Sequence, residues 1–72
     1  MIFTDSAGHM VSDTSLDELH AFAASIGLRR DWFQDKRIPH YDLTTQRKRT
    51  KAIRFGAALV GSKDIVRKAV YT

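Results

Sequence analysis

Three histidines, each near a carboxylate in the sequence, are the residues best suited to chemistry. His9 falls between Asp5 and Asp13, and His40 lies two residues before Asp42. A His-x-Asp pair on an extended segment presents imidazole and carboxylate on one face, where they can bind a divalent metal or transfer protons. The candidate polar cluster comprises His9, Asp13, His20, His40 and Asp42.

Any metal at this cluster would be held by imidazole and carboxylate groups, because the chain has no cysteine. Such ligands suit zinc, manganese or iron rather than a structural thiolate site. A divalent metal is therefore the cofactor hypothesis, with His9, His20, His40 and Asp42 as its ligands. The alternative is structural: His20 hydrogen-bonds a backbone carbonyl, and His40 fixes a turn with Asp42.

Helical geometry restricts which of these groups can converge. Glu18 and His20 lie roughly 160° apart on a helix that turns by about 100° per residue, so they cannot easily share one ion. Glu18 suits a helix cap, whereas His20 borders the apolar stripe and is placed to reach His9 or His40 across a sheet. A metal-dependent hydrolase, such as a nuclease, requires the three imidazoles to lie within about 5 Å of one point.

A second candidate site is a run of five basic residues between positions 47 and 54. On a helical wheel Arg47, Lys51 and Arg54 point away from the apolar positions. Arg47 and Lys51 repel one another one turn apart, which weakens a helix by roughly 0.2–0.5 kcal/mol. A phosphate backbone would accept such a row of charges. We assign anion binding to Arg47, Lys48, Lys51 and Arg54, and the alternative is a solvated outer face.

A helix-turn-helix is a further interpretation of the middle of the chain. Ala23, Gly27 and Phe33 have spacings that resemble the alanine, turn glycine and buried apolar residue of that motif. The second helix would start at residue 29 or 30 and enter the major groove of DNA. Pro39 opposes this interpretation, because the residue before a proline is extended and the recognition helix would be barely two turns long.

Strands that would position these groups are predicted in three places. Ile2–Thr4 and Met10–Ser12 are β-prone runs that suggest an N-terminal hairpin. Residues 57–60 form a short apolar run between two glycines, which is typical of a buried strand, and we expect it to pair with the first strand. Pro39 makes residues 38–43 extended. In that stretch Pro39, Tyr41 and Leu43 would face inward, and His40 and Asp42 would share the other face.

Three helices complete the predicted elements. Ser15 and Glu18 form a capping box at the start of a helix over about 15–26, and Gly27 ends it. A second helix starts at residue 44 or 45 and ends at Gly56, and Ser62 caps a third. A short helical turn is expected at 30–34. The apolar stripes are Ala52 and Ile53 in the second helix and Ile65, Val66, Ala69 and Val70 in the third.

The predicted fold is a single compact α+β domain over residues 1–72. A small mixed β-sheet, made of the N-terminal hairpin and the strand near 57–60, is covered by the three helices, which we expect on one face. No apolar run approaches the roughly 18 residues of a membrane span, and no signal peptide is evident. We expect a soluble, cytoplasmic protein, to whose modest stability a homodimer would add.

Charge is divided unevenly along the chain. Residues 1–27 contain four acidic residues and no Lys or Arg, and the remainder contains all twelve basic residues against four acidic ones. The two parts therefore carry −4 and +8, which gives the net +4. Such a split favours an acidic partner, either nucleic acid or an acidic protein surface, although small soluble domains commonly carry charged faces.

Several short segments together resemble a known family. They are Met10–Asp13, Glu18–Ala23, Ile26–Leu28, Trp32–Gln34, Pro39–Leu43 and Gly56–Ala57. The chain from about 2 to 60 resembles domain-of-unknown-function family 4031 (DUF4031), short bacterial and phage proteins. The resemblance implies no activity. It does imply that seven residues are family features: Asp5, His9, Asp13, His20, His40, Tyr41 and Asp42. The Asp5–His9 connection is shorter than is usual in that family.

We expect a small, basic, non-enzymatic phage or bacterial accessory protein that binds an anionic macromolecule, and we favour nucleic acid over an acidic protein. One alternative is the metal-dependent hydrolase or nuclease. Another is a phage-encoded inhibitor of a host enzyme, with Trp32 as the partner contact, since Trp32 is predicted to be partly exposed and Phe33 to be core.

Overall fold

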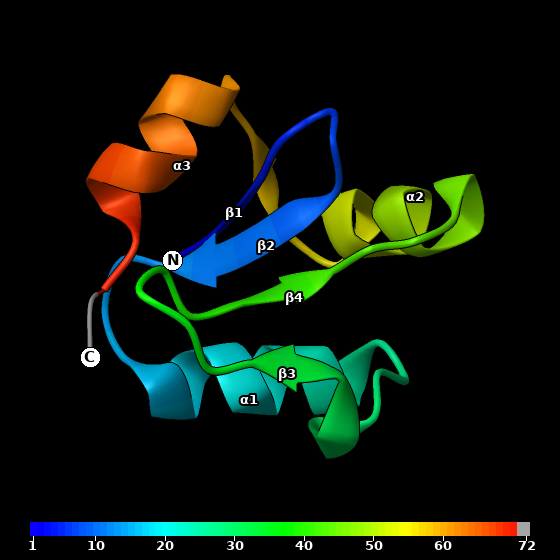
Figure 1. Ribbon diagram of the computed structural model, residues 1–72. Coiled ribbons are helices and arrows are strands. Elements are labelled where there is room, and N and C mark those ends of the chain that lie inside the picture. Colours follow the sequence, from blue (N-terminus) through cyan, green and yellow to red (C-terminus); the bar gives the residue numbers. More distant parts are fainter. Residues whose placement is uncertain (71–72) are drawn as a thin grey trace.

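The structure is a computed structural model that describes residues 1–70 of the chain. Its strands form one mixed sheet in the order β3-β4-β2-β1-β5, and the α-helices pack against it (Figure 1). The predicted α+β fold is therefore confirmed. In chain order the elements are β1 (Ile2–Thr4), β2 (His9–Ser12), α1 (Leu16–Ser25), a 3₁₀ turn (Arg30–Trp32), β3 (Phe33–Gln34), β4 (His40–Asp42), α2 (Gln46–Arg54), β5 (Ala58–Leu59) and α3 (Ser62–Lys68).

The centre of the sheet contains the predicted N-terminal hairpin. β1 and β2 pair antiparallel, with Phe3 opposite Val11, and the connection contains Gly8 at a φ of 92°. A Cβ atom on Gly8 would lie 2.5 Å from the backbone oxygen of Leu43, so the close approach of these two backbones requires glycine. The hairpin turn is thereby held against the end of β4.

β5 pairs parallel with β1, with Phe3 opposite Ala58, as the sequence predicts. It is an edge strand, however, and not a buried one. Ala57 is buried just before it, but the Leu59 side chain is largely exposed. The prediction of burial fails at Leu59 because an edge strand has a neighbour on one side only, which leaves the other side open.

Side chains of the sheet alternate between two apolar layers. Met10 and Tyr41 lie on the face that α1 and α2 cover. Phe3 and Val11 lie on the opposite face and pack against Ile65 of α3. The expectation that all helices cover one face is therefore wrong, because the central strands are apolar on both faces and each face needs a covering element.

α1 begins and ends where the sequence predicts. The Ser15 hydroxyl accepts a hydrogen bond from the backbone N–H of Glu18, and Gly27 follows the helix at a φ of 83°. Only half of the capping box forms, however. The Glu18 carboxylate binds the Met1 amino group and the Ser12 hydroxyl instead of returning to the backbone of Ser15.

α2 and α3 differ from their predictions in detail. Thr45 caps α2 as expected, but the residue before α3 is Gly61 and no side chain caps that helix, so the predicted Ser62 cap is wrong. Ile53 and Val66 were assigned to inner stripes, yet both are about half exposed. No helix in residues 1–70 is long and apolar enough to cross a bilayer.

The segment after α1 contains no recognition helix. The predicted short turn is present as a 3₁₀ turn over Arg30–Trp32, and the chain then enters β3 at Phe33. β3 pairs with β4 at the edge of the sheet, with Phe33 opposite Tyr41. The helix-turn-helix interpretation is therefore wrong, because Phe33 is used to extend the sheet over the core.

Candidate functional site

The basic residues of α2 form an outward-facing surface. Arg49 turns inward, where its guanidinium donates to the backbone oxygen of Leu43 at 3.2 Å. The other four side chains, called the cationic ridge below, are Arg47, Lys48, Lys51 and Arg54. Within residues 1–70 none of the ion pairs joins the ridge to a carboxylate. The ridge is therefore not neutralised by the acidic residues of the described chain.

Exposed aromatic rings flank the cationic ridge at both ends. The Nζ atom of Lys48 lies 4.5 Å from the centroid of the Trp32 ring, and that of Lys51 lies 5.8 Å from the Phe55 ring. Trp32 is 39% exposed, as predicted, and Phe55 is 52% exposed. The position of Phe55 beside the ridge was not predicted from the sequence. The exposed indole also suits the inhibitor hypothesis, which stays a prediction.

Two hollows of the surface border the ridge. One, of about 410 Å³, is lined by Arg47, Lys51 and Arg54 together with Phe55. The other, of about 280 Å³, lies between Trp32 and Lys48 and also includes Asp42. Each hollow thus combines basic and aromatic side chains, and the second also contains the carboxylates of Asp31 and Asp42.

His9 and His40 lie next to each other in the fold and are called the histidine pair below. His9 is held by a buried carboxylate. Asp5 is 1% exposed and accepts hydrogen bonds from the backbone N–H and the Nδ1 of His9, both at 3.0 Å. Burial raises the pKa of Asp5, but the hydrogen bonds from His9 outweigh it, and the net pKa lies below the ordinary value. Asp5 is thus a carboxylate that fixes the proton of His9 on Nδ1 and leaves Nε2 for another partner.

The second member, His40, lies across the sheet from His9. Its Nδ1 is 2.6 Å from the backbone oxygen of Ile38, and its Nε2 is 3.3 Å from Asp42, so the predicted shared face of His40 and Asp42 is confirmed. The rings of His9 and His40 meet edge to face with centroids 5.5 Å apart. Both histidines come together because His9 pairs with Asp42 between β2 and β4.

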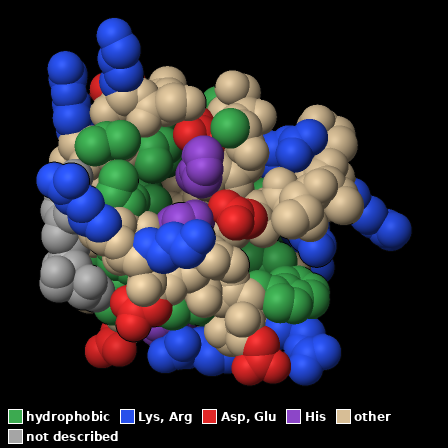
Figure 2. All heavy atoms as spheres, viewed as in Figure 1, with side chains coloured by type: hydrophobic (Ala, Val, Ile, Leu, Met, Phe, Trp, Pro, Cys, Tyr) green, Lys and Arg blue, Asp and Glu red, His purple; other side chains and the backbone are tan. Residues whose placement is uncertain are grey.

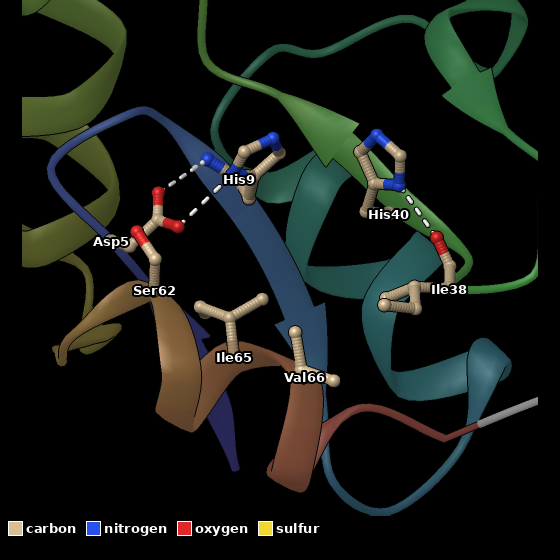
Figure 3. Close-up of a pocket in the computed structure, with 7 residues that line it drawn as sticks. All are labelled: Asp5, His9, Ile38, His40, Ser62, Ile65 and Val66. Atoms are coloured by element: carbon tan, nitrogen blue, oxygen red, sulfur yellow. Dashed lines mark hydrogen bonds and ion pairs between the residues drawn. The ribbon is translucent and has the colours of Figure 1, made fainter.

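The histidine pair borders an apolar pocket of about 230 Å³ between the sheet and α3 (Figure 3). Ile38, Ile65 and Val66 line its interior, and the Ser62 side chain lies beside Asp5. Figure 2 shows histidine side chains near the middle of this face, with acidic side chains directly beside them and Lys and Arg side chains around them. The carboxylates nearest the pair are those of Asp5, 3.0 Å from His9, and Asp42, 3.3 Å from His40, and the cations of this face lie around them.

His20 is not part of this pair. Its Nδ1 lies 2.8 Å from the hydroxyl of Tyr41, and its ring packs edge to face on Phe33 at 4.5 Å. Tyr41 points to the face opposite His40, so the sheet separates His20 from the other two imidazoles. Burial lowers the pKa of His20 and raises that of Tyr41. The expected reach of His20 to His9 or His40 is therefore wrong, and its partner is a tyrosine hydroxyl, not a backbone carbonyl.

Asp13 is also separate from the histidine pair. It lies just beyond the far end of β2 from His9, where it binds the Met1 amino group at 2.9 Å. This hydrogen bond lowers the pKa of Asp13. In residues 1–70 no three side chains of His, Asp or Glu are arranged to hold a metal ion. The predicted four-ligand site does not form, because strand alternation and strand length separate residues that are close in sequence.

Comparison with protein families matches the chain over residues 4–71, nearly its whole length, to the model DUF4031, whose description is "Protein of unknown function". The match extends further toward the C-terminus than the segments that carry the resemblance. No curated protein and no solved structure matches the chain.

Proposed function

We propose that this chain, which belongs to the DUF4031 family, binds nucleic acid through the cationic ridge of α2. One observation carries the proposal: Arg47, Lys51 and Arg54 are exposed, Lys48 is partly buried beside Trp32, and none of the four is paired with a carboxylate of residues 1–70. Like charges one turn apart cost helix stability. A phosphate backbone placed along the ridge would reverse that cost.

The dimensions of the ridge suit a polynucleotide. Arg47 and Arg54 are separated by seven residues, which is roughly 10 Å along a helix axis at about 1.5 Å per residue. This length corresponds to about three nucleotide steps of a stacked strand, whose axial rise is about 3.4 Å, so it spans about four phosphates. The ridge would therefore contact consecutive phosphates of one strand.

The flanking aromatic rings favour a single strand over a duplex. Proteins that bind single-stranded nucleic acid combine a basic groove with rings on which unpaired bases stack. Trp32 and Phe55 provide such rings at the two ends of the ridge, each beside a lysine. An acidic protein surface offers charge but no flat bases, so these rings support nucleic acid over that partner.

Trp32 makes the proposal directly testable, because it is the single tryptophan of the chain. A single-stranded DNA of roughly 12 nucleotides is titrated into the protein at about 50 mM salt, and tryptophan fluorescence is recorded. Stacking of a base on Trp32 should quench the emission in a saturable manner. Polyglutamate of similar charge serves as the matched acidic competitor and should neither quench the emission nor displace the DNA.

Two results would contradict the proposal. The first is the absence of any DNA binding at about 50 mM salt, by fluorescence or by anisotropy of a labelled strand. The second is equal binding of polyglutamate, which would assign the ridge to acidic proteins.

A further inference from the structure

We infer that His9 and His40 act as the general base and general acid of an RNA-cleaving site beside the cationic ridge. This inference rests on the proposed nucleic-acid binding and adds a substrate class to it. It stands on the geometry of the pair: two imidazoles 5.5 Å apart, one held by a buried carboxylate and the other placed between two oxygen acceptors.

His9 has the arrangement of a general base. The buried Asp5 accepts the Nδ1 proton of His9, so the lone pair of the neutral ring is on Nε2. The His9 side chain is 45% exposed, which leaves it accessible to a ligand. In Figure 3 the Nδ1 side of the ring is bonded to Asp5, and the rest of the ring extends away from Asp5 and Ser62. Asp5 acts through His9 and is a positioning residue.

His40 has the arrangement of a general acid. Its two nitrogens face two acceptors, the Ile38 backbone oxygen at 2.6 Å and the Asp42 carboxylate at 3.3 Å. The Nδ1–H of His40 donates to the Ile38 oxygen, so Nε2 is the nitrogen that exchanges a proton with a bound substrate, and as imidazolium it would donate that proton. Asp42 has a side chain that is 47% exposed, so it can turn toward solvent when a substrate oxygen takes its place at Nε2.

The histidine pair and the ridge belong to one surface. Asp42, which contacts His40, also lines the hollow between Trp32 and Lys48. A strand that stacks on Trp32 with a phosphate at Lys48 would therefore continue past Asp42 to the two imidazoles. General acids and bases act over about 2.6–3.2 Å, so two rings at this separation can reach an attacking and a leaving oxygen on either side of one phosphorus.

The substrate must supply its own nucleophile. The hydroxyl-bearing side chain that lines this pocket, Ser62, lies beside Asp5 and is not directed at the free nitrogen of His9 (Figure 3). RNA carries a 2′-hydroxyl next to each phosphate, which DNA lacks. The neighbouring 2′-hydroxyl therefore defines RNA as the substrate class.

The reaction balances without another reactant. His9 Nε2 takes the proton of the 2′-hydroxyl while the 2′-oxygen forms a bond to phosphorus. The bond from phosphorus to the 5′-oxygen breaks, and that oxygen receives a proton from His40 Nε2. The products are a strand ending in a 2′,3′-cyclic phosphate and a strand with a free 5′-hydroxyl. Both protons move between imidazole and oxygen, so the step requires no metal.

The experiment incubates the whole chain with a labelled single-stranded RNA in buffer containing EDTA, and separates the products by length and end group. We expect fragments with 2′,3′-cyclic phosphate ends. His9→Ala and His40→Ala should each reduce the rate about 100-fold or more, as expected for removal of a general acid or base. Binding of a DNA strand of the same sequence, measured in parallel, should be unchanged in both variants.

His20→Gln is the matched control, because it removes a histidine from the opposite face of the sheet. It should cleave RNA at the wild-type rate. Circular dichroism of all three variants checks that each is folded. Cleavage that persists equally in His9→Ala and His40→Ala, or that EDTA abolishes, overturns the inference. RNA that is bound but uncut overturns the inference alone, whereas failure to bind either strand overturns the proposed function as well.

Discussion

The salt dependence of binding gives the sharpest test of the cationic ridge. Each phosphate that a protein cation neutralises on a single strand contributes about −0.7 to the slope of log affinity against log salt concentration. The four ridge cations therefore give a slope of about −2.8. A rise from about 50 to about 200 mM salt should then weaken binding about 50-fold.

Removal of two ridge charges should halve the slope of log affinity against log salt concentration. Arg47→Gln with Arg54→Gln leaves two cations, a slope of about −1.4 and a loss of about sevenfold over the same range of salt. The control is Lys63→Gln with Arg67→Gln on α3, which removes the same net charge outside the ridge. Its slope should remain near the wild-type value.

Anisotropy of a labelled single-stranded DNA, measured at several salt concentrations, checks both variants. DNA is used because it cannot undergo cleavage through a 2′-hydroxyl. If the α3 variant lowers the slope as much as the α2 variant, the affinity depends on net charge and not on the ridge. A wild-type slope in the α2 variant would refute the assignment of Arg47 and Arg54.

Three further predictions concern the fold that positions these groups. Gly8→Ala should destabilise the protein by about 2 kcal/mol or more in urea unfolding, because its Cβ would meet Leu43 at 2.5 Å. Gly56→Ala is the control, because a Cβ there would have no atom within 4 Å and only the φ of 116° is unfavourable; it should lower the free energy of unfolding by about 1 kcal/mol. Equal losses of stability in the two variants would contradict the contact between Gly8 and Leu43. Burial holds the pKa of His20 below its ordinary value of 6.5. As the pH falls, the imidazole of His20 is therefore protonated in the unfolded chain before it is protonated in the folded chain. The free energy of unfolding should then fall as the pH drops below about 6.5. His20→Gln should remove this dependence, measured by urea unfolding between pH 5 and 8 at intervals of about one unit. Thr4→Val should be neutral or stabilising by up to about 1 kcal/mol in the same assay, because the buried Thr4 hydroxyl has no hydrogen-bond partner in residues 1–70; a loss of stability would reveal a hidden partner.

Local patterns in the sequence were sufficient for much of the fold. Ser15 and Thr45 cap α1 and α2 as predicted, and Gly27 follows α1 with positive φ. The pairing of β5 with β1 also followed from sequence order. The layering could not be predicted in the same way, because the burial of Ile65 against Phe3 depends on which face each crossover reaches.

Parts of the candidate sites were likewise predictable from short-range patterns, and other parts required the folded structure. The cationic ridge was predictable, because helix periodicity directs Arg47, Lys51 and Arg54 to one side. The shared face of His40 and Asp42 was predictable from strand alternation. The flanking of the ridge by Trp32 and Phe55 was not, since the 3₁₀ turn and the end of α2 meet Lys48 and Lys51 only in the folded chain.

The sequence by itself determined where helices start and stop, which side chains share a face of one element and how charge is divided along the chain. These are short-range properties, fixed by backbone geometry and the period of each element. Only the tertiary structure decided that His9 meets His40 while His20 binds Tyr41 on the other side of the sheet. Such contacts depend on strand register and on the face that each helix covers, which are set by long-range packing.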